Sequence, residues 1–210
     1  MKIFYIDTTS KYLYTGIVQD NNLLNERKKC LGKDMSVYVL NEVNEMFEEV
    51  NLRPRDIDKI MVCNGPGSFT GIRIGVTLAK MMSWALNIPI ITISSLEAMA
   101  SIKRDNILLV PIIDARRNAC YAAIYDGKKA ILEGEYLTLE KLFLFLKGIN
   151  QNYVFISNDN YDFPKEKYNP DILEIVLNYE ERKPTPSHLV NPLYLKLTEA
   201  EENKEKEENT

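Results

Sequence analysis

The chain has 210 residues, of which 45% are hydrophobic and 27% charged, a composition ordinary for a soluble globular protein with a sizeable core. Three cysteines far apart in the sequence argue against a disulfide framework. The N-terminus does not resemble a signal peptide, and no apolar run approaches the roughly 20 residues of a membrane span. We therefore expect a cytoplasmic protein. The net charge of −4 comes from residues 199–210, which contain six Glu and two Lys. We predict that this segment is an acidic disordered tail. The rest of the chain is close to neutral, which disfavours autonomous binding of nucleic acid.

Apolar patterns in the first part of the chain predict three strands, a helix and a fourth strand. Strands are expected over 3–7, 12–18 and 23–30. Apolar residues then recur at three and four positions through 35–50, with glutamates on the opposite side, as in an amphipathic helix. After a linker, the apolar run 59–63 predicts another strand.

A glycine-rich loop, 65–75, joins this strand to a helical pattern at 72–86. Glycine permits positive φ and close approach of a backbone or ligand, and the N–H groups that begin a helix favour an anion. The loop lacks the lysine of a Walker A pattern, and Thr70 stands where a dinucleotide fingerprint needs its third glycine. Two interpretations stay open: a tight turn that serves packing, or a phosphate contact through Gly65, Gly67, Ser68, Thr70 and Gly71.

The helix at 72–86 is apolar on two sides. One stripe contains Ile72, Val76, Ala79 and Leu86, and the other contains Ile74, Leu78, Met81, Met82 and Ala85. Such a helix is buried on two sides. One side is expected to face the sheet, and the other faces either a partner subunit or the interior of the fold.

The second half of the chain repeats the first at an offset of 107 residues. After a strand at 90–93 and a short helix from Ser95, a strong strand at 107–114 ends in Asp114, which corresponds to Asp7. The next strand aligns at the same offset, and a third strand and a helix complete the same order of elements. The repeated order favours a duplication.

Two such lobes predict the α/β fold of actin, Hsp70 and sugar kinases, a ribonuclease H-like architecture of mixed sheets flanked by helices. In that architecture two Asp-bearing turns face each other across a cleft and hold nucleotide phosphates and a metal ion. Asp7, Thr8, Thr9 and Asp114 are therefore candidate contacts for a nucleotide or phosphate. The alternative is that both aspartates only cap their turns.

The glycine loop resembles the signature of the bacterial TsaB (YeaZ) family. Supporting segments are Ile6-Asp7-Thr8-Thr9, Ile113-Asp114-Ala115-Arg116 with Tyr121, and Pro192-Leu193-Tyr194-Leu195-Lys196. The chain departs from the family at Met35, where many members carry histidine, and the segment 150–187 matches poorly, so the second lobe is expected to be reduced or remodelled.

The resemblance implies a non-catalytic subunit of the complex that adds threonylcarbamoyl to N6 of adenosine 37 in tRNAs reading ANN codons. Family members bind and activate TsaD, work with TsaE and meet tRNA only through the complex, and form a homodimer when alone. No tightly bound cofactor is implied, although ATP or ADP is a candidate at the subunit boundary. Because His188 is the only histidine, neither the His-x-x-x-His metal pair of TsaD-like enzymes nor a His-Glu-x-x-His protease motif can form, and no metal site is expected.

We therefore expect a partner-binding N-terminal lobe, 1–102, a C-terminal lobe, 103–198, and the tail. The helices at 35–50 and 70–86 are expected to pack against their counterparts in TsaD. The predicted interface residues are Val39, Val43, Met46, Phe47, Ile74, Leu78, Met81, Met82 and Ala85. The alternative is a small-molecule kinase or ATPase of the same superfamily with Asp7 as general base, although 210 residues leave little room for substrate-binding insertions.

Overall fold

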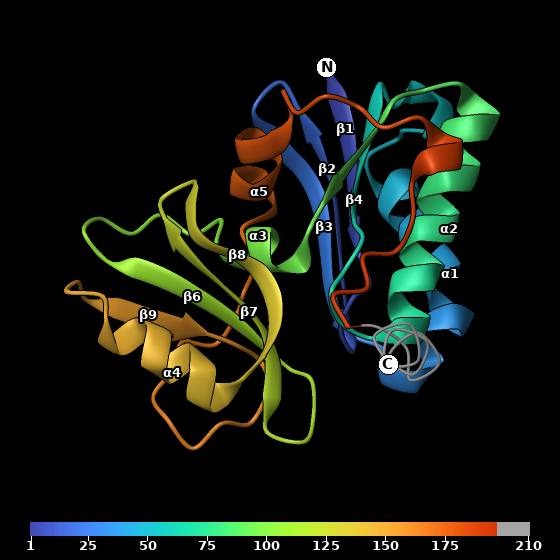
Figure 1. Cartoon of the computed structure of the whole chain (residues 1–210). Helices are drawn as coiled ribbons and strands as arrows, with labels where there is room; N and C mark the ends of the chain where they lie inside the picture. Colours follow the sequence, from blue (N-terminus) through green and yellow to red (C-terminus); the bar gives the residue numbers. More distant parts are fainter. Residues whose placement is uncertain (197–210) are drawn as a thin grey trace.

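The computed structural model describes residues 1–196 and contains two mixed sheets, each flanked by helices (Figure 1). The strands are β1 (Lys2–Asp7), β2 (Tyr12–Gln19), β3 (Asn22–Cys30), β4 (Lys59–Cys63), β5 (Ile90–Ile93), β6 (Leu108–Asp114), β7 (Ala119–Asp126), β8 (Lys129–Thr138) and β9 (Tyr153–Ile156). The helices are α1 (Met35–Glu49), α2 (Phe69–Leu86), α3 (Ser95–Met99), α4 (Leu139–Lys147) and α5 (Ile172–Tyr179). The predicted tail, 199–210, lies outside the described residues.

The first sheet has the order β3-β2-β1-β4-β5 and is covered on both faces. Strand β1 pairs antiparallel with β2 and parallel with β4. Its side chains alternate between the faces, so Phe4 and Ile6 enter the core under α1 and α2, whereas Ile3 and Tyr5 enter the core under α5. Figure 1 shows α1 and α2 on one side of this sheet and α5 on the other. The uninterrupted apolar run of β1 follows from burial on both faces.

The second sheet has the order β8-β7-β6-β9, with α4 packed on one face. Strands β6, β7, β8 and β9 pair in the same way as β1, β2, β3 and β4. Helix α4 follows β8 as α1 follows β3. The predicted two-lobe fold is therefore confirmed. The first sheet has a further strand, β5, beside β4. Within the described residues the second sheet has no corresponding strand beside β9.

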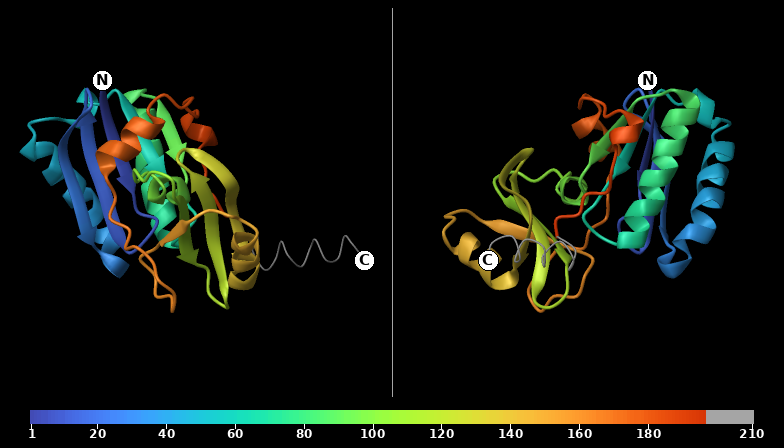
Figure 2. Two further views of the ribbon diagram at one scale, coloured as in Figure 1. Left: turned by 90° about the vertical axis from the view of Figure 1, so that its left-hand side faces the viewer. Right: turned by 45° about the vertical axis from the view of Figure 1, so that its right-hand side comes forward.

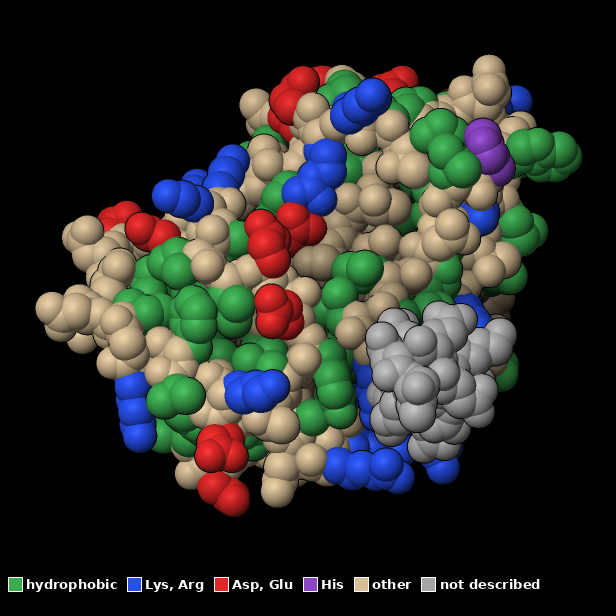
Figure 3. Space-filling model, in the orientation of Figure 1, with side chains coloured by type: hydrophobic (Ala, Val, Ile, Leu, Met, Phe, Trp, Pro, Cys, Tyr) green, Lys and Arg blue, Asp and Glu red, His purple; other side chains and the backbone are tan. Residues whose placement is uncertain are grey.

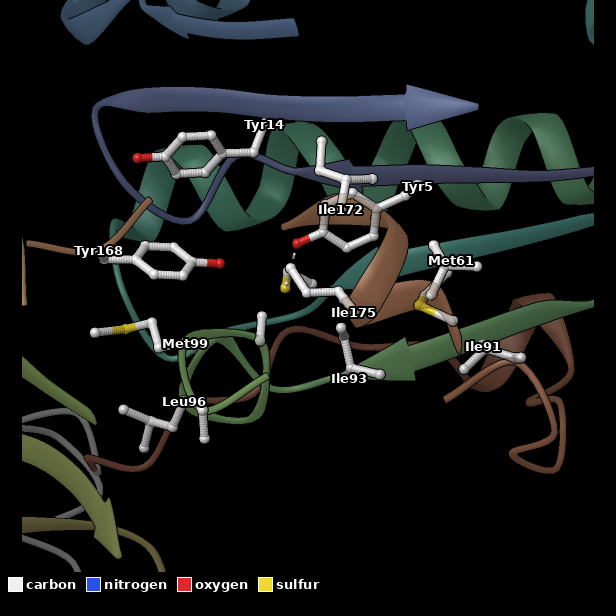
Figure 4. Close-up of a cluster of buried hydrophobic side chains, with 14 of the residues drawn as sticks. Tyr5, Tyr14, Met61, Ile91, Ile93, Leu96, Met99, Tyr168, Ile172 and Ile175 are labelled. Atoms are coloured by element: carbon white, nitrogen blue, oxygen red, sulfur yellow. Dashed lines mark hydrogen bonds between the residues drawn. The ribbon is translucent and has the colours of Figure 1, made fainter. Parts of the chain in front are cut away.

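The end of the chain returns to the first sheet, which differs from the expected C-terminal lobe, 103–198. Helix α5 packs on β1, β2 and β3, and the N–H of Thr185 donates to the carbonyl of Ile90. Helix α3 lies between the two sheets, where Leu96 and Met99 join the core that both sheets share (Figures 2 and 4). The first lobe therefore includes residues from both ends of the chain, and the two lobes cannot be separated at one position in the sequence. No helix in 1–196 is both long and apolar enough to span a membrane.

Candidate functional site

The glycine loop is docked on the turn between β1 and β2. The N–H of Ser68 donates to the carbonyl of Thr9 at 2.6 Å, and the hydroxyl of Thr8 donates to the carbonyl of Gly71 at 2.6 Å. Ser68 is also the N-cap of α2, because its Oγ accepts from the N–H of Gly71 at 3.2 Å. The turn after β1 and the start of α2 therefore form one connected unit.

Close packing accounts for the glycines of this loop. A Cβ atom on Gly67 would meet the carbonyl oxygen of Thr9, and one on Gly71 would meet the carbonyl oxygen of Thr8. Gly67 also has a φ of +152°, and Gly65 has a φ of +116°, values that side-chain-bearing residues rarely adopt. These contacts support the packing interpretation. A phosphate contact through the loop stays a prediction, and Ser68 and Thr70 are its exposed polar side chains.

Asp7 and Asp114 hold equivalent positions in the two lobes. Asp7 accepts from the N–H of Thr9 at 2.8 Å, and Asp114 accepts from the N–H of Arg116 at 2.8 Å. Each carboxylate thus caps its own turn across the same two-residue spacing. Asp7 is buried, and desolvation raises the pKa of its carboxyl despite the hydrogen bond from Thr9.

A cleft of about 650 Å³ separates the two lobes, and both Asp-bearing turns line it. Of the predicted nucleotide contacts, the cleft is lined by Asp7, Thr9, Gly67, Ser68, Thr70 and Asp114. The other three are not lining residues: the hydroxyl of Thr8 is hydrogen-bonded to the carbonyl of Gly71, and a Cβ atom on Gly65 would meet Leu193 and Ile72. The structure therefore brings together most, but not all, of the predicted set.

Sequence reasoning missed several lining residues of this cleft. Lys11 and Arg116 supply the positive charge of the lining, which also contains the carboxylates of Asp7, Asp114 and Asp159. Arg116 begins three consecutive residues with φ between +53° and +65°, and no sequence pattern signalled this left-handed turn. Because both charge signs are present, the lining is not a simple anion cradle.

The floor of the cleft meets a buried polar cluster around β1 and β4. The hydroxyl of Tyr5 lies 3.5 Å from Sγ of Cys63, and the ring of Tyr168 packs edge-on against that of Tyr14. Figure 4 shows the side chains of Tyr5, Tyr14 and Tyr168 in this cluster. Burial raises the pKa of the Cys63 thiol, which keeps it in the weakly nucleophilic thiol form. Within 1–196 no group of His, Cys, Asp and Glu side chains is placed to hold a metal ion, and His188 is exposed (Figure 3).

A second cavity is an apolar groove of about 460 Å³ between α1 and α2. It is lined by Ser36, Val39, Leu40, Phe69, Thr70, Arg73, Ile74, Thr77, Leu78 and Met81. Two of the lining side chains are large, apolar and exposed, Leu40 (53% exposed) and Met81 (62%), and Trp84 (80%) is exposed three residues after Met81 on α2. Exposed apolar patches of this kind mark interaction sites.

The structure corrects part of the predicted interface. The α1 residues Val43, Met46 and Phe47 are only 0–4% exposed and belong to the core of the first lobe. Val39 belongs to the same core at 3% exposed, although it also lines the groove. Ile74, Leu78 and Met82 are half-buried, whereas Met81 and Ala85 are exposed. Other large apolar side chains of the same two helices are exposed and were not in the predicted set: Tyr38, Leu40, Phe69 and Trp84. Their signal was an apolar or aromatic side chain outside the core stripe of an amphipathic helix.

Comparison with known proteins agrees with this architecture. Residues 30–177 match the family model described as TsaD, tRNA N6-adenosine threonylcarbamoyltransferase. The tRNA threonylcarbamoyladenosine biosynthesis protein TsaB of Bacillus subtilis is 32% identical over 221 residues, covering 96% of both chains. TsaB of Escherichia coli K12 is 28% identical over 140 residues, covering 64% of this chain and 60% of that protein.

Two solved structures from Pseudomonas aeruginosa share the fold. One is YeaZ, with a TM-score of 0.72 and 17% identity, covering 92% of this chain and 99% of that one. The other, described as an uncharacterized protein with similarity to peptidase YeaZ, has a TM-score of 0.74 and 16% identity, covering 93% and 99%. On matches that span nearly its whole length, the chain belongs to the TsaB (YeaZ) family of tRNA threonylcarbamoyladenosine biosynthesis proteins.

Proposed function

We propose that the chain is the non-catalytic subunit that binds and activates TsaD in the complex that adds threonylcarbamoyl to adenosine 37 of tRNAs reading ANN codons. The observation that carries the proposal is the exposed apolar surface around the groove between α1 and α2. Aromatic and methionine side chains of this kind supply much of the binding energy in protein interfaces. The groove therefore fits a partner that brings its own apolar helices.

The match to the TsaD family model supports TsaD as this partner. A partner with the same fold would present helices equivalent to α1 and α2, so two like surfaces would pack face to face. The same surface would pair two copies of this chain when TsaD is absent, giving a homodimer. TsaE and tRNA would meet the chain only through the complex, in the cytoplasm.

A non-catalytic role is supported by the use of the polar residues in the cleft. Both aspartates cap turns, and the hydroxyl of Thr8 is used to hold α2. We propose that no nucleotide binds tightly to the chain alone and that ATP or ADP binds at the boundary with TsaD. Titration of ADP into the chain, and then into its mixture with TsaD, separates these two cases.

One observation favours the alternative, a small-molecule kinase or ATPase. Asp7 lines the cleft with a raised pKa, as a general base would. Phosphoryl transfer from ATP by the purified chain that disappears in Asp7→Asn would support this alternative. We expect no such turnover, because the carboxylate is buried and engaged with the turn.

The direct test is binding to the cognate TsaD by calorimetry, followed by tRNA modification with and without this chain. Leu40→Glu combined with Met81→Glu places charges on two exposed groove residues, which should leave the fold intact but remove TsaD binding and modification. Leu144→Glu is the matched control, because Leu144 is 70% exposed on α4 of the second lobe. Normal TsaD binding by a folded groove variant would exclude this surface.

A further inference from the structure

The C-terminal segment 190–196 is tied to the first lobe beside the start of α2. The carbonyl of Val190 accepts from Nζ of Lys80 at 2.8 Å, and the N–H of Leu193 donates to the carbonyl of Asn64 at 2.7 Å. Asn64 also donates from Nδ2 to the carbonyl of Asn191 at 3.1 Å. These contacts bring Tyr194 next to two residues that line the groove.

Tyr194 forms a three-membered stack with Phe69 and Arg73. Its ring lies 5.4 Å from the ring of Phe69, and its hydroxyl accepts from Nε of Arg73 at 3.0 Å. The guanidinium carbon of Arg73 lies 3.7 Å from the centre of the Phe69 ring, a cation–π contact. Phe69 and Tyr194 are half-exposed, so this stack is not explained as part of the core.

The residues after Tyr194 reach the second lobe. Leu195 packs against the core shared by both sheets, beside Gly134 of β8. Nζ of Lys196 lies 5.1 Å above the ring of Tyr136, also on β8. Consecutive residues of this segment thus contact the partner-facing end of α2 and then the opposite lobe.

We propose that Tyr194 is a positioning residue for the docking of the partner. This proposal rests on the proposed function of the groove. It holds Phe69 and Arg73 in one conformation before the partner arrives. Without Tyr194 these exposed side chains would be ordered only on binding, and that loss of freedom would weaken the complex.

The geometry also indicates the chemistry of the partner. Nε of Arg73 is used by Tyr194, while within 1–196 its two Nη groups make no hydrogen bond or ion pair. A guanidinium that is held at Nε presents these groups in a fixed fork, which suits a carboxylate. The partner surface that faces Arg73 is therefore expected to carry an Asp or Glu beside apolar residues that contact Phe69.

The test measures the affinity of variants for the cognate TsaD by calorimetry, together with their melting temperatures. Tyr194→Phe keeps the ring and removes only the hydroxyl, so it should weaken binding about 3-fold, in keeping with the net free energy of one hydrogen bond. Tyr194→Ala also removes the aromatic pair, so it should weaken binding about 10-fold. Tyr153→Phe and Tyr153→Ala are matched controls. Tyr153 is 38% exposed against 45% for Tyr194, and its ring lies 5.5 Å from that of Phe155, yet it lies in the second lobe.

A double-variant cycle separates positioning from simple contact. Arg73→Lys removes Nε, so adding Tyr194→Phe should weaken binding no further if the hydroxyl acts through Arg73. Wild-type chain that fails to bind TsaD would refute the proposed function. Wild-type binding with an unchanged affinity in Tyr194→Phe would refute the positioning role alone, and Tyr194→Phe decides the question even if Tyr194→Ala does not fold.

Discussion

Gly75 on α2 offers a sharp test of why the glycine-rich segment needs its glycines. It is buried, and a Cβ atom on it would meet the hydroxyl oxygen of Thr8. The next nearest atom is Cβ of Thr8 at 3.6 Å, an ordinary contact distance. The obstacle to a side chain at this position is therefore a single hydroxyl group. Removing that hydroxyl should make room for alanine.

The magnitudes follow from opposing effects. In the middle of a helix, Gly→Ala should stabilise by about 1 kcal/mol from helix propensity, but overpacking against a fixed neighbour costs about 1–3 kcal/mol. Gly75→Ala alone should therefore lower the free energy of unfolding by up to about 2 kcal/mol. Thr8→Ala alone loses the hydrogen bond to the carbonyl of Gly71, which costs about 1 kcal/mol.

In the Thr8→Ala background the clash is gone, so Gly75→Ala should keep only its propensity gain. The double variant should then be close to wild type, about 1 kcal/mol more stable than Thr8→Ala. Urea unfolding followed by circular dichroism measures all four free energies. Gly148→Ala is the control, because its Cβ would lie 3.4 Å from the nearest atom. Equal destabilisation by Gly75→Ala in both backgrounds would refute the reasoning.

Three further predictions concern single residues. Asp7→Asn should stabilise the chain at neutral pH, because desolvation raises the folded-state pKa of Asp7. The stability of the wild type should therefore fall as pH rises from about 4 through that pKa. Urea unfolding midpoints measured across this pH range should show the fall in the wild type and not in the variant. Ser68→Ala should cost about 1 kcal/mol through loss of the N-cap, whereas Thr70→Ala should cost less, as thermal melts would show; equal costs would contradict the capping assignment. Met46→Ala should cost about 2–5 kcal/mol by leaving a cavity, and a neutral effect in urea unfolding would contradict its place in the core.

Much of the fold could be predicted because the sequence contains an internal repeat of the same order of elements. The repeat at an offset of 107 residues aligned β1 with β6, and the pairing of β6 with β7 and β9 matches that of β1 with β2 and β4. What the repeat could not predict is α5, which follows the second lobe in sequence but packs on the first sheet. An amphipathic pattern says that one side of a helix is buried, and says nothing about which sheet buries it.

The same limit explains which residues could be placed at the cleft from the sequence. Asp7 and Asp114 could be placed on one cleft because each ends a strand at an equivalent turn. On α1, by contrast, the apolar stripe was assigned to a partner, and the structure assigns it to the core of the lobe. The strongest stripe on a helix is the one that its own sheet covers first. A partner surface is better sought among the apolar residues left outside that stripe, such as Leu40 and Trp84.

The start of α2 links the two candidate surfaces. Phe69 and Thr70 line both the cleft between the lobes and the groove between α1 and α2. A ligand in the cleft and a partner in the groove would therefore touch the same turn of helix. If binding of one changes the affinity for the other through that turn, the second must change the affinity for the first by the same factor. For this reason nucleotide titrations and TsaD titrations should be made on the same variants. A groove variant such as Leu40→Glu with Met81→Glu, whose changed residues lie away from the cleft lining, isolates the partner's contribution to nucleotide binding.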